Sequence, residues 1–283
     1  MNAPDAQHTI ARPVTLAGTG LHSGTTVTAR LLPLGPDSGI RFRRADLGAS
    51  ALIPATVEYA VDAERRTELT SGEATVHTVE HLLAAAASLA IDNLEVELDA
   101  PEPPALDGSA EPWVRALLDG GIVDQDAVAR IGAIGEPVSL QEGDSRYTVS
   151  PGDAYRVQAT IAFDHPLVGT QSEVATVDAT FATRFAPART FGLLRWKDEL
   201  QARGLALGAG THNTVVLTDD GLADGMTLRF SNEFVRHKIV DVVGDLALLG
   251  VRLQACVEAD RPSHRGNLAL ARVLRKQLKA RQA

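Results

Sequence analysis

The sequence predicts an α+β fold of two similar domains, each with helices packed on a β-sheet. The length of 283 residues suits about two domains of roughly 150 residues each. Strand-like and helical runs are present in both halves. A polar pair, an apolar helix and a strand follow one another once in each half, which indicates two units whose polar pairs meet between them. Amphipathic helices before strands are common, so chance also accounts for this repetition.

The elements follow from local patterns. β-branched or alternating runs predict strands at residues 27–32, 40–43, 94–98, 157–163 and 214–217. Apolar residues at helical spacing predict helices at residues 76–90, 113–119, 193–203, 232–249 and 267–280. The stretch from Gly120 to Arg130 is typical of a boundary, so we expect an N-terminal domain at residues 1–125 and a C-terminal domain at 126–283.

Composition narrows the class of protein. The formal net charge of −9 argues against a basic nucleic-acid-binding protein. The single cysteine, Cys256, excludes an intramolecular disulfide and favours a reducing compartment. The N-terminus has no signal-peptide pattern, and the longest near-apolar run, residues 82–91, is too short to span a membrane. We therefore expect a cytoplasmic protein without a transmembrane segment.

One helix carries an unusual polar stripe. His237, Asp241 and Asp245 are four residues apart, so they share one face of the predicted helix at 232–249. Gly244 lies on this face and would allow another element to approach closely. A His and an Asp at this spacing can chelate one metal ion. A solvated face with a His–Asp hydrogen bond gives the same pattern, and both interpretations stay open on this segment alone.

The helix in the first half could complete such a site. Glu80 directly precedes His81 on an apolar helix, and this pair can supply a base and a metal ligand. Two histidines and one aspartate would leave a fourth zinc position for water, whose pKa zinc lowers to about 7. His264, in the loop before the last predicted helix, is a candidate general acid or a capping residue without a chemical role.

Seven motifs carry a resemblance to a known family. They are GTGLHSG at 18–24, TVEHLLAA at 78–85, IDN at 91–93, LDGSA at 106–110, ARTFG at 188–192, FVRHKIVD at 234–241 and GDL at 244–246. In this order they resemble the zinc-dependent UDP-3-O-acyl-N-acetylglucosamine deacetylase family of lipid A biosynthesis. The resemblance covers nearly the whole chain, from about residue 10 to about residue 275.

The resemblance implies two α+β domains with the active site at their interface, and it implies roles for the residues already singled out. His81, His237 and Asp241 match the family's zinc ligands, and Glu80 matches its general base. His264 matches the family's general acid, and Asp245 matches the residue that orients it. Thr190 matches a hydroxyl that stabilises the oxyanion. The implied reaction is hydrolysis of the N-acetyl amide, which gives acetate and the free amine.

Further positions match substrate contacts. Lys238 matches a residue at the sugar-phosphate part, Phe163 an aromatic that stacks on uracil, and Arg261 stands where members often carry a Lys at the diphosphate. Phe191 and the following segment match an insert, at about residues 190–210, that forms a passage for the acyl chain.

Two places depart from the family's pattern. The run Ser263, His264, Arg265, Gly266 replaces a run with Gly before the catalytic histidine, which changes the local backbone and adds a charge. Ala162 stands where some members have an Asp that bonds the base of the nucleotide. These departures bear on how His264 is presented and on how uracil is bound.

The implied partner is a small-molecule acylated UDP-sugar, with no role for nucleic acid. A site of two histidines and one aspartate tolerates Fe²⁺ as well as Zn²⁺. Because the substrate is amphiphilic, we also expect peripheral contact with the inner membrane. Two alternatives stay open: a zinc deacetylase of another acylated amino sugar, which Ala162 would permit, and a catalytically silent binding homologue.

Overall fold

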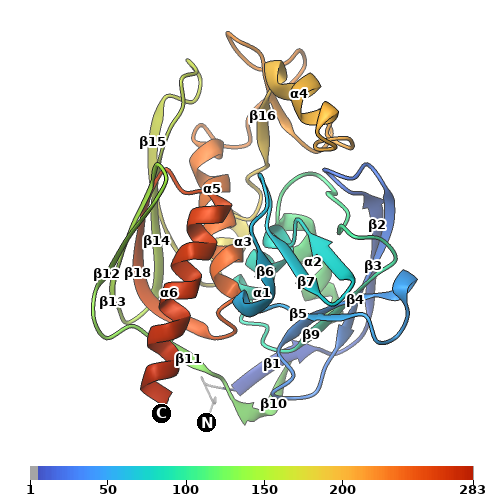
Figure 1. Cartoon of the computed structure of the whole chain (residues 1–283), viewed down its shortest axis with the longest axis vertical. Coiled ribbons are helices and arrows are strands. Elements are labelled where there is room, and N and C mark those ends of the chain that lie inside the picture. The colour runs from blue at the N-terminus through green and yellow to red at the C-terminus, as the bar shows by residue number, and fades with distance from the viewer. Residues whose placement is uncertain (1–5, 283) are drawn as a thin grey trace.

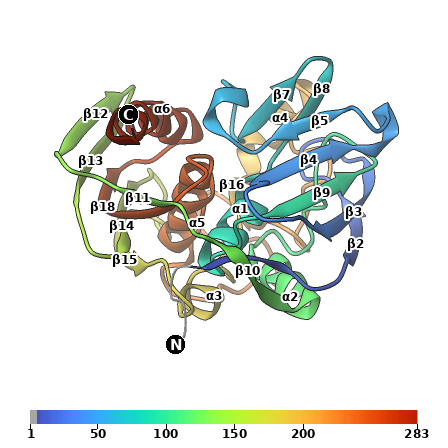
Figure 2. The ribbon, with the colours of Figure 1, turned by 90° about the horizontal axis from the view of Figure 1, so that it is seen from below.

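The computed structural model describes residues 6–282, and it confirms the predicted α+β class. Two sheets stand on opposite sides of the molecule, with α1, α5 and α6 between them (Figures 1 and 2). All strands of one sheet precede residue 99, and all strands of the other follow residue 130. This separation agrees with two units that each combine a sheet with helices. The domain boundary at residue 125 stays a prediction.

The N-terminal half contains a five-stranded sheet and a smaller three-stranded one. The larger sheet has the order β2 (Val14–Thr19), β3 (Thr26–Pro33), β9 (Leu94–Leu98), β4 (Ile40–Arg44) and β5 (Leu52–Pro54). The smaller one contains β6 (Ala60–Val61), β7 (Glu68–Ser71) and β8 (Ala74–His77). The helices are α1 (Glu80–Ser88) and α2 (Glu111–Gly120), with short 3-10 turns η1 (Ala45–Leu47) and η2 (Val57–Tyr59).

The C-terminal half is built on a six-stranded sheet. Its order is β12 (Val138–Glu142), β13 (Ser145–Pro151), β18 (Arg252–Asp260), β14 (Tyr155–Ala162) and β15 (Thr170–Thr176), with β11 (Ile131–Ala133) also paired to β18. Its helices are α3 (Phe181–Arg184), α5 (Glu233–Ala247) and α6 (His264–Gln282). Helix α5 packs on β14 and β15, and α6 packs on β12 and β13.

Two smaller pairings complete the fold. β1 (Ala6–Ile10) pairs antiparallel with β10 (Ile122–Val128), so a strand lies where the sequence suggested a boundary. The predicted insert contains β16 (Phe191–Leu193), a 3-10 turn η3 (Leu194–Trp196) and α4 (Lys197–Ala202), and β16 pairs with β17 (Val215–Leu217). Figure 1 shows this insert standing above α1 and α5. No helix in residues 6–282 combines the length and apolarity needed to span a membrane.

Contact between α1 and α5 determines where the polar pairs lie. Helix α1 is buried on nearly every side, as expected of a helix that is apolar all round. It crosses α5 at Gly244, where an added Cβ would lie 2.0 Å from the Glu80 carbonyl oxygen. The glycine in the stripe on α5 therefore allows the approach that the sequence suggested, and it brings Glu80 and His81 against α5.

Most predicted elements are present, and two differ. The predicted helix at 76–90 begins only at Glu80, because His77 still belongs to β8 and Thr78 has a φ of 58°. The predicted helix at 193–203 is divided among β16, η3 and α4, because residues 191–193 pair with β17. Both differences arise from hydrogen bonds to segments distant in sequence, which local periodicity does not register.

Candidate metal centre and active site

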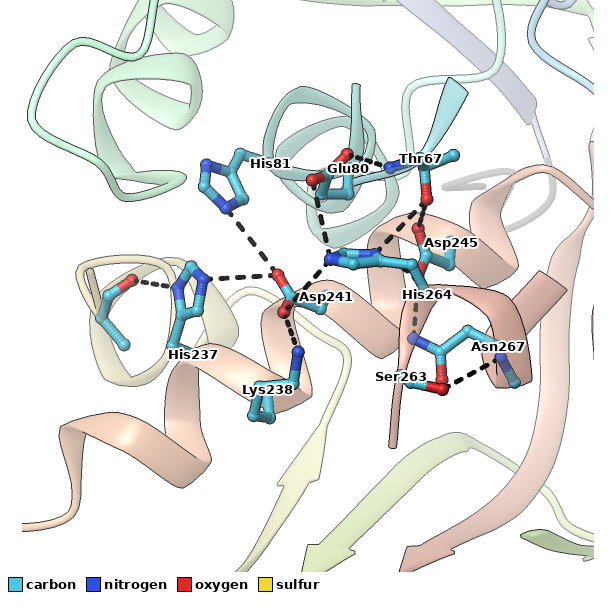
Figure 3. A network of polar contacts seen from close by, with 12 residues as sticks. Thr67, Glu80, His81, His237, Lys238, Asp241, Asp245, Ser263, His264 and Asn267 are labelled. Carbon is cyan, nitrogen blue, oxygen red and sulfur yellow. Dashed lines mark hydrogen bonds and ion pairs between the residues drawn. The ribbon is translucent and has the colours of Figure 1, made fainter. Parts of the chain in front are cut away.

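Three buried side chains from two helices converge at one point. Helix α1 supplies His81, and α5 supplies His237 and Asp241 from one face (Figure 3). Their candidate ligand atoms all lie within 4.8 Å of one another. The Nε2 atoms of His81 and His237 lie 3.7 and 3.4 Å from Oδ1 of Asp241. The structure thus brings together the three residues that the sequence predicted as ligands.

The chemistry of this group fits a cation. Oδ1 of Asp241 is buried without a hydrogen-bond partner, which is costly for a carboxylate unless a positive charge compensates. Burial lowers the pKa of His81 to about 3 and also lowers that of His237, so both rings are neutral and able to ligate. Nδ1 of His237 donates to the Ala188 carbonyl at 3.1 Å, which leaves the Nε2 lone pair directed at the group. Two imidazoles and one carboxylate are a common ligand set for a divalent transition metal.

Lys238 holds the other oxygen of the aspartate. Its Nζ donates to Oδ2 of Asp241 at 2.6 Å, and both residues line the same cavity. Burial alone would raise the pKa of Asp241, but Lys238 and the neighbouring histidines outweigh it and hold the pKa well below its usual range. The carboxylate is therefore ionised, with one oxygen neutralised by the lysine and the other free for a cation.

Glu80 lies beside this group at the first position of α1. Burial raises its pKa to about 7, and the backbone N–H of Thr67 donates to Oε2 at 3.2 Å. Two residues earlier, Thr78 adopts a left-handed conformation that β-branched residues rarely adopt. The Thr78 N–H donates to the Thr67 carbonyl, and its hydroxyl donates to Glu102. These contacts fix the turn that places Glu80 at the start of the helix.

His264 faces Glu80 from the beginning of α6. Its Nδ1 donates to Oδ2 of Asp245 at 2.9 Å, while Nε2 lies 3.8 Å from Oε1 of Glu80 and 3.8 Å from Oδ2 of Asp241. Burial lowers the pKa of His264, but the carboxylates of Asp245, Glu80 and Asp241 outweigh burial and raise it to about 9. The ring is therefore a protonated imidazolium at neutral pH, positioned by a buried carboxylate.

A network of neutral groups fixes that carboxylate in turn. Nδ2 of Asn267 donates to Oδ2 of Asp245 at 2.8 Å, and the Thr67 hydroxyl donates to Oδ1 (Figure 3). The Tyr147 hydroxyl donates to Oδ1 of Asn267 at 2.8 Å. Asp245 is fully buried, so these donors replace the water that would otherwise solvate it.

The unusual run at 263–266 is accommodated around His264. The Arg265 side chain is 68% exposed and pairs with Glu142 on β12, so its charge points away from the site. An added Cβ at Gly266 would lie 2.5 Å from the Tyr147 hydroxyl oxygen, so a larger residue here would have to displace the Tyr147 side chain. The departure therefore leaves the contact between His264 and Asp245 intact.

A cavity of about 230 Å³ extends from these groups toward the insert. Thr190, Phe191, Phe163 and Lys238 line it. The catalytic role of Thr190 and the substrate contacts of the other three stay predictions. Thr190 is held by its N–H to the Gly108 carbonyl at 2.8 Å. Arg261 is exposed and is not among the cavity's lining residues, so the structure does not bring it to this site.

Sequence reasoning missed two residues that support the site, Thr67 and Glu102. Thr67 contacts both Glu80 and Asp245, and Glu102 accepts hydrogen bonds from the backbone N–H groups of His22 and Ser23 as well as from Thr78. The first motif and the turn before α1 are thus joined at one buried carboxylate. Nothing in the local pattern identifies either residue, because their partners lie far along the chain.

Comparison with known proteins gives the family. The family model of UDP-3-O-acyl N-acetylglycosamine deacetylase, LpxC, matches residues 7–276. A protein of Brucella melitensis biotype 2, named UDP-3-O-acyl-N-acetylglucosamine deacetylase, is 43% identical over 272 residues, or 95% of this chain and 94% of the relative. One of the same name from Syntrophotalea carbinolica is 40% identical over 259 residues, or 91% of this chain and 84% of the relative. With its buried histidines, aspartate and glutamate at one end of an apolar cavity, the chain belongs to the UDP-3-O-acyl N-acetylglycosamine deacetylase family, as its motifs predicted.

Proposed function

We propose that this protein hydrolyses the N-acetyl amide of a UDP-linked, 3-O-acylated N-acetylglucosamine, as a metal-dependent deacetylase of lipid A biosynthesis. The observation that carries the proposal is that a candidate metal-binding group and an acid–base pair lie next to each other at one cavity. His81, His237 and Asp241 form a cation site, while Glu80 and His264 face each other beside it. Amide hydrolysis needs an activated water, a clamp for the carbonyl oxygen and a proton for the leaving amine, and this arrangement has a residue for each.

The metal would be held by His81, His237 and Asp241. When bound there, a divalent ion supplies a Lewis acid that polarises a carbonyl and makes a water molecule more acidic. We propose Zn²⁺ as that ion, supported by the neutral imidazoles and by the family. The same donor set also suits Fe²⁺, so the identity of the ion is an outcome of the test below.

Glu80 acts as the general base in this proposal. Its carboxylate is next to the cation group in sequence and is held by the Thr67 N–H, so it has a fixed position from which to accept a proton of the attacking water. The water oxygen forms a bond to the acetyl carbon, and the resulting tetrahedral carbon carries an anionic oxygen. Thr190 lines the cavity, and its hydroxyl would donate to that oxygen, where one such donor lowers the barrier by roughly 3 kcal/mol.

His264 acts as the general acid. Asp245 holds Nδ1, which leaves the Nε2 proton on the side of Glu80 and the cavity. Collapse of the tetrahedral carbon breaks the C–N bond, and His264 gives its proton to the departing amine. The products are the free amine and acetic acid, which ionises to acetate by releasing its proton to solvent. The proton taken by Glu80 returns to His264 and restores both groups.

The rest of the cavity suits an acyl-sugar. Its walls include apolar side chains of the insert and its flanks, namely Phe191, Leu193, Leu194, Trp196 and Leu200. Lys238 is the cation nearest the ligand group in this cavity and would contact the sugar-phosphate part. Phe163 packs edge-on against Phe191, with ring centroids 5.4 Å apart, so uracil stacking would use a ring that the insert already supports. Arg261 lies apart from the cavity lining and would reach the diphosphate only from the rim.

The test is acetate release from UDP-3-O-(3-hydroxyacyl)-N-acetylglucosamine by the purified protein. Three samples are compared: one as purified, one treated with a chelator, and the treated one restored with Zn²⁺ or Fe²⁺. Release that disappears with the metal and returns with it supports the proposal and identifies the ion. Release only from other acylated amino sugars would favour the alternative substrate. No release by folded, metal-loaded protein would favour a silent homologue. The cytoplasmic location and the membrane contact stay predictions.

A further inference from the structure

Glu102 is a fully buried carboxylate that is not among the lining residues of the cavity. It accepts hydrogen bonds from the backbone N–H groups of His22 at 3.0 Å and Ser23 at 2.7 Å, and from the Thr78 hydroxyl at 2.8 Å. Burial of a carboxylate is costly unless such donors replace water. The donors belong to two segments that are far apart in the sequence, so the carboxylate connects them.

The first segment is the turn that leads into α1. Thr78 adopts a left-handed φ of 58°, which is held by its hydroxyl on Glu102 and by its N–H on the Thr67 carbonyl. Helix α1 begins without a side chain that caps its first N–H groups. Glu80 is the first residue of α1, so this turn determines where the helix, and with it the Glu80 side chain, begins.

The second segment is the turn at residues 20–24, which pairs with the end of the insert. The N–H groups of Leu207 and Gly208 donate to the carbonyl oxygens of His22 and Leu21, at 3.1 and 3.0 Å. Leu21 and His22 also line the cavity. This turn therefore joins the end of the insert to one wall of the cavity, and Glu102 holds the turn from behind.

The two segments meet at Glu102. Within residues 6–282, no hydrogen bond runs directly between residues 20–24 and residues 77–81. A side chain added at Gly20 would collide with the Glu102 carboxylate, so the turn lies directly against it. The hydrogen-bonded link between the start of α1 and this wall of the cavity thus runs through one carboxylate.

We propose that Glu102 is a positioning residue for the deacetylation, which holds Glu80 in a fixed relation to the cavity wall at residues 21–22. This inference rests on the proposed function and adds to it a residue outside the cavity. A displacement of about 1 Å at a catalytic group can lower the rate roughly 10²-fold. Because Glu80 acts on the reacting water, loss of Glu102 should lower kcat more than it raises KM.

The experiment compares acetate release by metal-loaded wild type, Glu102→Ala, Glu102→Gln and Thr78→Val. Glu102→Ala removes every contact of the carboxylate, whereas Thr78→Val removes one hydroxyl and keeps a β-branched side chain. The amide of Glu102→Gln can accept from the backbone N–H groups and donate to the Thr78 hydroxyl. Glu95→Ala is the matched control, because Glu95 is also a buried carboxylate but pairs with Arg41 and Arg43 in the N-terminal sheet. Thermal melting shows whether each variant folds.

Glu102→Ala should lower kcat by roughly 10- to 100-fold, with KM changed less than about threefold. Thr78→Val should show a smaller loss of kcat. Glu102→Gln should restore kcat to within about threefold of wild type, and Glu95→Ala should keep the wild-type value. In a Glu80→Gln background, Glu102→Ala should lower kcat by less than about threefold, because the base that it positions is already absent.

A second measurement does not depend on activity. Amide hydrogen exchange is followed at Thr78, Leu207 and Gly208, whose N–H groups are hydrogen-bonded in the two segments. Exchange in both segments should be at least about tenfold faster in Glu102→Ala than in wild type, and Glu95→Ala should leave it unchanged.

Two results would overturn the inference. One is a kcat of folded Glu102→Ala equal to that of wild type. If that variant does not fold, an unchanged kcat of Thr78→Val has the same meaning. The other is a full loss in the Glu80→Gln background, which would show that Glu102 supports the fold and not the base. If metal-loaded wild type releases no acetate, the proposed function fails, whereas hydrogen exchange still tests whether Glu102 joins the two segments.

Discussion

The two carboxylate oxygens of Asp241 have different surroundings. One oxygen of Asp241 accepts from Lys238, and the other is buried and unpartnered with two neutral imidazoles beside it. A carboxylate in water would distribute its charge over both oxygens equally. Here the lysine neutralises one oxygen, so a metal ion is the natural partner of the other.

Replacing Asp241 by Asn should therefore remove metal without unfolding the protein. The amide has the same shape and keeps an oxygen for one neighbour, but it lacks the negative charge that a divalent ion requires. We expect metal affinity to fall by at least about tenfold. Metal per chain after dialysis against a graded chelator measures this, with the exposed Asp178→Asn as the control. Full retention of metal would contradict the ligand assignment.

A substitution of Glu80 can distinguish loss of catalysis from loss of metal binding. Glu80→Gln keeps the size of the side chain but cannot accept a proton from water. We expect kcat to fall by roughly 10²- to 10⁴-fold while metal content is unchanged, because general-base catalysis contributes about that much. Steady-state kinetics together with metal analysis make the comparison. If a metal-replete variant keeps most of its turnover, another group is the base.

At the scale of elements, the contact of α1 with α5 positions the site. The Glu80 carbonyl rests on Gly244, and the two helices carry the three candidate ligands between them. Both helices are mostly buried, so their spacing is set by packing rather than by solvent. A small change in that spacing would move His81 relative to His237.

Gly244→Ala tests this spacing. Its methyl group would overlap the backbone of Glu80 at 2.0 Å, and backbone cannot move aside as a flexible side chain can. We expect a loss of roughly 1–3 kcal/mol in the free energy of unfolding, together with weaker metal binding. Gly35→Ala is the matched control, because an added Cβ there has open space. Denaturant titration of both variants measures the free energy of unfolding. Equal stability of Gly244→Ala and Gly35→Ala would show that α1 and α5 can move apart at little cost.

The sequence predicted α5 and its stripe because four-residue spacing is a local property of a helix. His237 and Asp241 could therefore be singled out from the residues, as could Glu80, His81 and His264 as candidates, and the resemblance then gave each of them an expected role. Thr67 escaped prediction because its contact with Asp245 joins residues 178 positions apart. The sequence did not predict that the helix expected at 193–203 is divided, for a similar reason: β16 forms by pairing with β17. What the sequence could not show was pairing between distant segments.

At the scale of the whole molecule, buried histidines couple the free energy of unfolding to pH. His22 and His77 lie around the buried carboxylate of Glu102. Burial lowers the pKa of each histidine to about 4, although Glu102 opposes this. In the unfolded chain both rings titrate near 6.5.

Acid should therefore destabilise the protein before its carboxylates titrate. Between about pH 6.5 and about pH 4 the unfolded chain binds more protons than the folded one, so the free energy of unfolding falls as the pH falls. The melting temperature should decline over this range, and His22→Gln should decline less steeply. Loss of metal at acid pH affects both proteins alike, so the difference in slope isolates His22. Identical slopes would show that His22 is not buried in its neutral form.

The separation of the ligands along the chain has a consequence for biosynthesis. His81 leaves the ribosome long before His237 is made, and at about 5–20 residues per second the interval is on the order of ten seconds. During that time α1 has no α5 to cover its apolar surface, and only one of the three candidate metal ligands has been made. A nascent chain thus cannot assemble the candidate metal site until α5 has been made. Until then the apolar surface of α1 is accessible to chaperones and proteases. Loading with metal becomes a late step, after nearly the whole chain has been synthesised.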